Sequence, residues 1–253
     1  MSTPGPSGEV VVEVAVDSVQ GVCAATEGGA DRIELCSALE LGGLTPSAGL
    51  CARARAATAL PIFAILRLRP GDFSLDADDL TLLVREMEEL RRLGVDGFVC
   101  GALTPDGAVD VHATRELLAA ASPSGFTFHR AFDVAQDLDA ALDTLCELGV
   151  PRVLSSGGEF DAARGAHKLA ALVQRADRRI SIMAGGGVRH GNVRAIVAGS
   201  GVREVHLSAA RIADGPMRWR GARMVFDVPG RDPFTRRETS ADEVRALREA
   251  LRA

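Results

Sequence analysis

Lysine is almost missing from this chain. Its 253 residues include 29 lysines and arginines, and Lys168 is the one lysine among them. A Schiff-base mechanism therefore has a single candidate, which lies inside a predicted helix, and we expect no such chemistry. Long apolar runs are missing as well, and the mean hydropathy is only +0.11. Because a membrane-spanning helix needs about 18–20 apolar residues in a row, we expect no membrane partner.

Cysteines are few and scattered. Five are present, an odd number with no Cys-x-x-Cys pair: Cys23, Cys36, Cys51, Cys100 and Cys146. This spacing argues against a disulfide framework and against a structural zinc site. The plainest expectation is that each thiol behaves as a small buried hydrophobe.

An excess of positive charge is also lacking. The formal net charge is -5 at pH 7, so the chain has no electrostatic footprint for nucleic acid and we expect no nucleic-acid partner. Residues 1–8 lack the basic start and apolar core of a secretory signal. We interpret them as a disordered tail on a cytoplasmic protein. Hydrophobic residues make up 47% of the chain, which is ample for a buried core.

Apolar runs alternate with helical patterns along the chain. Predicted strands cover 10–16, 32–35, 62–68, 97–100, 126–129, 152–155, 180–183 and 204–208, and predicted helices cover 19–27, 46–58, 77–93, 109–121, 138–148, 161–176 and 191–198. The repeat of about 25–35 residues is the size of one βα unit. We therefore predict an α/β fold, a (β/α)8 TIM barrel forming a single domain over residues 9–253. An open doubly wound sheet is the alternative.

Two local signals complete the predicted outline. Thr45 is expected to cap the second helix, with Pro46 in its first turn. Residues 209–239 read as a long irregular loop that contains Trp219, a candidate lid or subunit contact. A terminal helix is predicted over 240–252, opened by a capping box from Ser240 to Glu243.

Alternation along the predicted strands gives the direction of each side chain. Val12 and Val14 should face the helices, which turns polar residues into the barrel: Glu13, Glu34, Arg67, His129 and His206. Isolated charges are costly to bury, so these groups must pair or face solvent at the mouth. They form either a structural network, such as Glu13 or Glu34 with Arg67, or an acid–base site. The catalytic candidates are Glu34, Arg67, Arg69, His129 and His206.

Glycine-rich turns follow several strands and indicate an anion site. Arg67 and Arg69 could grip an anionic group, although Asp72 could equally bond them. Backbone N–H groups near glycine can approach a phosphate, which makes candidates of six residues in the turns after strands six to eight: Ser155, Gly157, Gly185, Gly186, Gly187 and Ser208. Asp133 follows His129 closely and could set its tautomer or raise its pKa.

Several sequence words occur in the order seen in the CutC family. They are GADRIELC with GGLTPS, the run from Arg67 to Phe73, TFHRAFD, RVLSSGG, IMAGGGVR and EVHLSA. The chain thus resembles this family over most of residues 9–220. The resemblance implies a cytoplasmic (β/α)8 barrel linked to copper homeostasis and copper binding, and a homo-oligomer, with a dimer favoured. It also implies Cys36 as a copper ligand.

The chain departs from the family pattern where copper would bind. Ala15 and Val16 stand where members often carry a tandem cysteine pair, and Phe63 stands where many have histidine. Cu(I) prefers soft ligands, so a single thiol makes a poor site.

Three functional readings therefore remain. The first is a copper-homeostasis protein that binds a copper ion. The second is an isomerase, lyase or aldolase whose partner is a small anionic or phosphorylated molecule at the carboxyl-terminal mouth. The third is a scaffold whose interior charges are structural.

Overall fold

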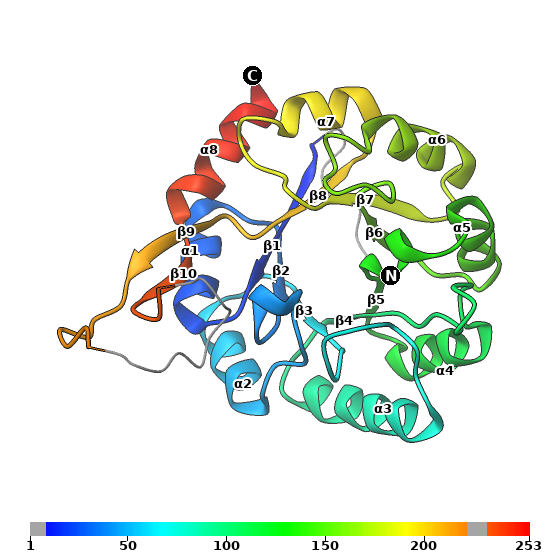
Figure 1. The fold of residues 1–253 in the computed structure, drawn as a ribbon, viewed down its shortest axis with the longest axis horizontal. Coiled ribbons are helices and arrows are strands. Elements are labelled where there is room, and N and C mark those ends of the chain that lie inside the picture. The colour runs from blue at the N-terminus through cyan, green and yellow to red at the C-terminus, as the bar shows by residue number, and fades with distance from the viewer. Residues whose placement is uncertain (1–8, 222–231) are drawn as a thin grey trace.

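The barrel in the computed structural model is built from eight parallel strands and closes where β1 pairs with β8 (Figure 1). Residues 9–221 and 232–253 are described. The strands are β1 (Val11–Val16), β2 (Arg32–Leu35), β3 (Ile62–Ile65), β4 (Gly97–Cys100), β5 (Gly125–Phe128), β6 (Arg152–Ser155), β7 (Ser181–Gly185) and β8 (Glu204–Leu207). The predicted TIM-barrel fold is confirmed.

Helices follow the strands and surround the barrel (Figure 1). They are α1 (Val19–Gly28), η1 (Leu39–Leu41), α2 (Ala48–Ala57), α3 (Ala77–Arg92), α4 (Val111–Ala121), η2 (Arg130–Val134), α5 (Leu138–Glu147), α6 (Ala166–Ala176), α7 (Val193–Ser200) and α8 (Ala241–Arg252). Helix starts are stabilised by side-chain caps, for example Asp76 in the capping box of α3. No described helix is long and apolar enough to cross a membrane.

The start of α2 differs from the prediction. Its N-cap is Ser47, whose hydroxyl accepts a hydrogen bond from the Leu50 N–H, and not Thr45. Thr45 is held by the segment after β3 instead, because its N–H donates to the Arg67 carbonyl and its hydroxyl accepts from the Arg67 N–H. The chain is thus tied to this neighbouring segment before it can begin the helix.

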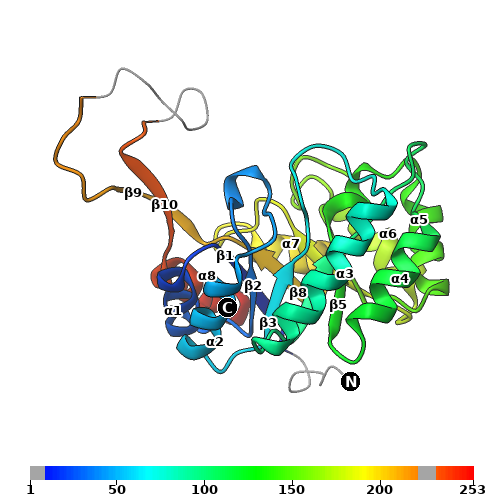
Figure 2. The same ribbon diagram turned by 90° about the horizontal axis from the view of Figure 1, so that it is seen from below.

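The segment predicted as an irregular loop contains two strands. β9 (Ala210–Asp214) and β10 (Thr235–Thr239) pair as an antiparallel ribbon that extends away from the barrel (Figure 2). Pairing satisfies the backbone hydrogen bonds that a loop would leave to water. The predicted capping box of α8 is also wrong: the Ser240 side chain makes no cap hydrogen bond, and Glu243 pairs with His190. The predicted tail, residues 1–8, lies outside the described residues.

The strands have two distinct faces. Val12, Val14 and their counterparts on other strands pack in the main core between barrel and helices. Cys36, Phe63, Ile65 and Val99 form a separate small cluster inside the barrel. The predicted alternation of inward and outward side chains is therefore confirmed for these strands.

Phe63 lies inside the barrel, toward the amino-terminal ends of the strands. Its ring lies against two glycines, and a Cβ atom on Gly125 would stand 2.4 Å from its ring, and on Gly97 2.6 Å. Only glycine fits at these two positions without a shift of the ring. The aromatic side chain thus closes off the space below the polar residues in the barrel.

Candidate functional site

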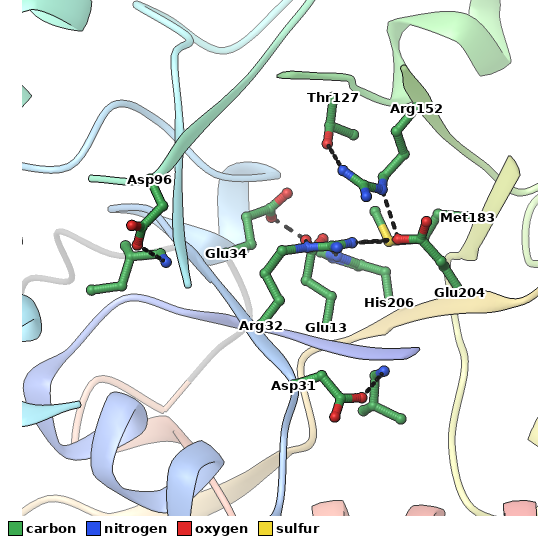
Figure 3. A network of polar contacts seen from close by, with 12 residues as sticks. Glu13, Asp31, Arg32, Glu34, Asp96, Thr127, Arg152, Met183, Glu204 and His206 are labelled. Carbon is green, nitrogen blue, oxygen red and sulfur yellow. Dashed lines mark hydrogen bonds and ion pairs between the residues drawn. The ribbon is translucent and has the colours of Figure 1, made fainter. Parts of the chain in front are cut away.

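Three ionisable side chains meet inside the barrel from three neighbouring strands. Glu13 lies on β1, Glu34 on β2 and His206 on β8, and their polar atoms lie within 4.8 Å of one another (Figure 3). The strand register explains this meeting, because Glu13 pairs with His206 across β1 and β8 while Glu34 pairs with Ala15 across β1 and β2. Two of the sequence candidates, Glu34 and His206, are thus brought together.

Glu13 orients the histidine. Its Oε1 lies 2.8 Å from His206 Nδ1, while Oε2 accepts a hydrogen bond from Arg32. Burial alone would raise the pKa of Glu13, but Arg32 and then His206 hold it well below its usual range. An ionised Glu13 favours a proton on Nδ1, which leaves Nε2 of His206 as the nitrogen that faces Glu34.

Glu34 is the unusual member of this cluster. It is 2% exposed, its Oε1 stands 3.7 Å from His206 Nε2, and its Oε2 has no hydrogen-bond partner within the described part of the chain. Burial raises the pKa of Glu34 to about 7, an effect that His206 opposes and Glu13 strengthens. The pKa of His206 is raised against burial by Glu34 and Glu13. Glu34 can therefore change protonation near neutral pH, and its neighbours favour the protonated form of His206.

A buried ion network lies on the amino-terminal side of this cluster. Glu204 Oε2 accepts hydrogen bonds from Arg32 Nη2 at 2.7 Å and from Arg152 Nε at 2.6 Å (Figure 3). Ser181 donates to the other oxygen at 2.6 Å. Burial disfavours the ionised form, but Arg152 and Arg32 keep the pKa of Glu204 lowered. Arg32 pairs with Glu13 and Glu204, while Glu34 faces His206, so the predicted pairing of Glu13 or Glu34 with Arg67 is wrong.

Arg67 and His129 form a second cluster at the carboxyl ends of the strands. Both line a small cavity of about 20 Å³ together with Phe73, whose ring faces the Arg67 guanidinium at 5.1 Å. Arg67 donates to the carbonyls of Leu41 and Gly71, yet its Nε is buried without a partner in the described residues. Burial and then Arg67 lower the pKa of His129 to about 4, so this imidazole is neutral at pH 7.

Arg69 lines the same small cavity. β3 ends at Ile65, and the exposed Arg69 side chain forms an ion pair with Asp79 of α3 at 2.7 Å. The expectation that Arg67 and Arg69 grip one anion together therefore stays a prediction, in which the anion would compete with Asp79 for Arg69. Asp72 bonds Ser74 instead of holding the two arginines.

The turn after β6 already binds a carboxylate of the protein itself. Asp133 Oδ1 accepts hydrogen bonds from Ser155 Oγ at 2.6 Å and from the N–H groups of Ser156 and Gly158 at 2.9 and 3.1 Å. Gly157 donates to Ser155 Oγ. Asp133 thus fills the cradle predicted for an external anion, and it contacts Arg130 rather than setting the tautomer of His129.

The turn after β7 encloses an arginine. A Cβ atom on Gly186 would stand 3.2 Å from the guanidinium of Arg130, which also donates to Ser156. The carbonyls of Gly186 and Gly187 accept from Ala162 and Asn192, and Gly185 ends β7 beside His206. Ser208 follows β8 and is half-buried. Apart from Gly185 beside His206, these residues lie at the rim, away from the Glu34 pair.

The sequence model of the CutC family matches residues 10–211. The chain belongs to the CutC family. The family protein CutC of Chromobacterium violaceum is 44% identical over 95% of this chain and 98% of its own length. The human copper homeostasis protein cutC homolog is 38% identical over 96% of this chain and 89% of its own.

Solved structures agree with this assignment. A CutC protein from Streptococcus agalactiae superposes with a TM-score of 0.74 at 29% identity, covering 79% of this chain and 98% of that one. A phosphoribosylanthranilate isomerase from Thermotoga maritima reaches a TM-score of 0.58 at 10% identity, covering 96% and 98%. The second likeness shows the barrel fold alone.

The CutC name raises the question of copper, and the thiols here do not fit Cu(I). Cys36 is buried in the apolar interior cluster and donates to the Val16 carbonyl, and burial, then Glu34, raises its pKa far above its usual range. Cys100 packs in the core on the other face of the sheet. A protonated thiol without a second thiol beside it lacks the soft donors that Cu(I) prefers.

The carboxylate–histidine cluster is also a poor cation site as it stands. Both oxygens of Glu13 are engaged, one by His206 and one by Arg32, which adds a positive charge beside the cluster. A cation would have to compete with that guanidinium. The arrangement is better suited to moving protons than to holding a metal.

Arg32 and Arg152 are the residues that sequence reasoning missed. Both open an apolar strand and are buried at 7% and 6% exposure. Strand alternation could have identified Arg32, because it stands two residues before Glu34 and therefore lies on the same face of β2.

Proposed function

We propose that this CutC-family protein binds a small organic anion in the carboxyl-terminal mouth of its barrel and transfers a proton through Glu34 and His206. One observation carries the proposal: a buried carboxyl group with an unpartnered oxygen stands 3.7 Å from an imidazole nitrogen. Buried polar groups are normally paired, and those left unpaired concentrate at functional sites.

The chain's own residues divide the work. Glu13 holds the Nδ1 side of His206, so that Nε2 exchanges protons. Glu34, whose pKa is about 7, acts as acid when protonated and as base when ionised. Proton removal from a carbon beside a carbonyl and its return to a neighbouring atom is the reaction type that such a pair supports. Isomerases, lyases and aldolases share this step.

Arg67 is proposed to anchor the anionic group, because its buried Nε has no protein partner in the described regions. The cavity beside it, about 20 Å³, holds no more than one water. A ligand therefore has to displace part of the segment 66–75, where Gly71 adopts a φ of 110°. Loops that open and close over barrel mouths commonly gate access in this way.

A role in copper homeostasis is the second candidate, and the name of the human relative favours it. Under this proposal, the role in copper homeostasis depends on the small-molecule site and not on a Cu(I)–thiolate complex. Location in the cytoplasm and assembly into a homo-oligomer belong to the proposal as well. The exposed side chains of Ile212 and Trp219 on and beside the β9 strand are the surface that a second copy would cover.

The test is deuterium exchange in D2O. The protein is incubated with a panel of sugar phosphates and small keto acids, and loss of C–H signal is followed by proton NMR. We expect exchange into at least one compound with the native chain, and a loss of a hundredfold or more in Glu34→Gln and His206→Asn. His206→Asn retains a side-chain donor for Glu13, and Arg92→Gln, which removes an exposed arginine of α3, serves as the matched control.

The result that would contradict the proposal concerns copper binding. Melting of the reduced protein is measured with Cu(I), Zn(II), phosphate and the same panel, since ligands that bind the native state raise the melting temperature. No exchange and no anion effect, together with a large Cu(I) shift that Cys36→Ser abolishes, would overturn the proposal and establish a metal-binding protein.

A further inference from the structure

A broad depression of about 1230 Å³ lies at the amino-terminal face of the barrel. Its lining draws on the start of every strand, including Val11 of β1, Arg32 of β2 and Arg152 of β6. It is therefore at the opposite end from the mouth that Arg67 and His129 line. Active sites of TIM barrels lie at the carboxyl-terminal face, so this depression is separate from the proton-transfer site.

The floor of the depression is aromatic and cationic. The guanidinium groups of Arg32 and Arg152 lie 5.1 and 5.7 Å from the Phe63 ring centre. Arg32 bonds through Nε and Nη2, and Arg152 through Nε and Nη1. Within the described regions, the remaining terminal nitrogen of each group makes no hydrogen bond to the protein, which leaves donors on buried side chains at the cavity.

Positive charge dominates the lining. Five arginines face the depression against two acids: Arg32, Arg152, Arg178, Arg179 and Arg203 against Asp96 and Glu204. Asp96 is engaged by Arg55 at 2.9 Å, and three of the arginines are themselves paired: Arg32 with Glu13 and Glu204, Arg152 with Glu204, and Arg179 with Asp143. Among the described residues, Arg178 and Arg203 are the lining arginines that have no acidic partner. The chain as a whole carries a net charge of -5, so this face is a local exception that attracts anions.

The rim contains a strained arginine. Arg178 has a φ of 63° and follows Asp177 with a φ of 43°, a left-handed pair that residues other than glycine and asparagine rarely adopt. Arg178 is exposed and lines the depression, as Arg203 does. Asp177 is the left-handed C-cap of α6, and Arg178 extends this conformation one residue beyond the cap.

We propose that the amino-terminal face binds a small amphipathic organic anion. Arg178 and Arg203 hold its phosphate or carboxylate at the rim, and its apolar body packs against Leu118, Val173 and Ile182. Arg32 and Arg152 supply donors from the floor. The site uses neither Glu34 nor His206, although Arg32 also bonds Glu13 of that cluster. Each proposal can therefore fail without the other when the variants are made at Arg178, Arg203 or Glu34.

The test uses phenyl phosphate and benzoate, with inorganic phosphate and benzyl alcohol as partial ligands. Dissociation constants are measured by calorimetry at two salt concentrations. We expect at least one aromatic anion to bind tenfold more tightly than either partial ligand, and more weakly at high salt. Preference between the two aromatic anions identifies the head group.

Variants at the rim provide the decisive comparison. Arg178→Gly relieves the left-handed strain, so Arg178→Gly/Arg203→Gln should melt no lower than the native protein while binding at least tenfold more weakly. Arg53→Gln/Arg85→Gln removes the same charge from exposed positions on α2 and α3, and should bind as the native chain does. Glu34→Gln should also leave binding unchanged. Equal losses in both double variants, or equal binding of benzyl alcohol, would overturn the proposal.

Discussion

Glu34 Oε1 lies 3.7 Å from His206 Nε2, and both side chains are enclosed by the barrel. Their strands, β2 and β8, lie on either side of β1. The inward side chains of β1 are Glu13 and the small Ala15, which leave room for Glu34 and His206 to approach each other. A carboxyl group placed here is kept from water without gaining a full ion pair. This is the arrangement from which the pH behaviour of the protein follows.

The first prediction concerns Glu34→Gln and pH. The folded-state pKa of Glu34, about 7, lies above the usual 4.5, so the native state takes up a proton that the unfolded chain lacks. Stability is therefore lost as pH rises from about 4.5 through 7. Gln removes this loss, and we expect the variant to gain about 3 kcal/mol at pH 8 and little at pH 4. Urea unfolding at both pH values measures the difference, and an equal change at both would contradict it.

The second prediction concerns Arg32→Met. This change leaves Glu13 and Glu204 buried with one cation fewer, and breaking a buried pair costs about 3–5 kcal/mol. Arg69→Met removes an exposed ion pair with Asp79 and should change stability little. Both are measured by urea unfolding at pH 7. A small loss in Arg32→Met would mean that the interior glutamates are stable without it.

The third prediction concerns the cradle that Asp133 fills. Asp133→Gly empties it and leaves the Ser156 and Gly158 N–H groups without an acceptor, which should cost about 1–3 kcal/mol. Formate at roughly 0.1–0.2 M should occupy the empty cradle in place of the carboxylate. It should therefore raise the melting temperature of the variant part of the way back to the native value. Chloride at matched ionic strength is the control, and equal effects of the two salts would show that no anion site forms.

The fourth prediction concerns copper. Ala15→Cys places a second thiol on β1 next to β2, which Cys36 directly follows. Two thiolates satisfy Cu(I) better than one, so affinity should rise at least tenfold, a change of about 1.4 kcal/mol or more. Competition with a Cu(I) chelator measures it. The gain should vanish when Cys36→Ser is added; a gain that survives would place the metal elsewhere.

The sequence by itself determined the barrel, because strand and helix periodicities are local properties and eight βα repeats leave few other packings. It also determined which strand residues face inward, since alternation holds wherever the strand is intact. This was enough to identify Glu34 and His206 as interior groups. Beyond the end of β3 at Ile65 the alternation predicts less: Arg67 and Arg69 both line the small cavity at the mouth, but Arg69 also pairs with Asp79 of α3.

Only the tertiary structure decided which groups meet. Arg32, rather than Arg67, neutralises Glu13, and Asp133 occupies the cradle of Ser155 and Gly158, which lies 22–25 residues further along the chain. These contacts depend on strand register and on how loops cross the barrel ends, and spacing along the chain does not encode them. The location of the depression of about 1230 Å³, at the amino-terminal face, follows from the same cause: side-chain packing in three dimensions decides where space remains.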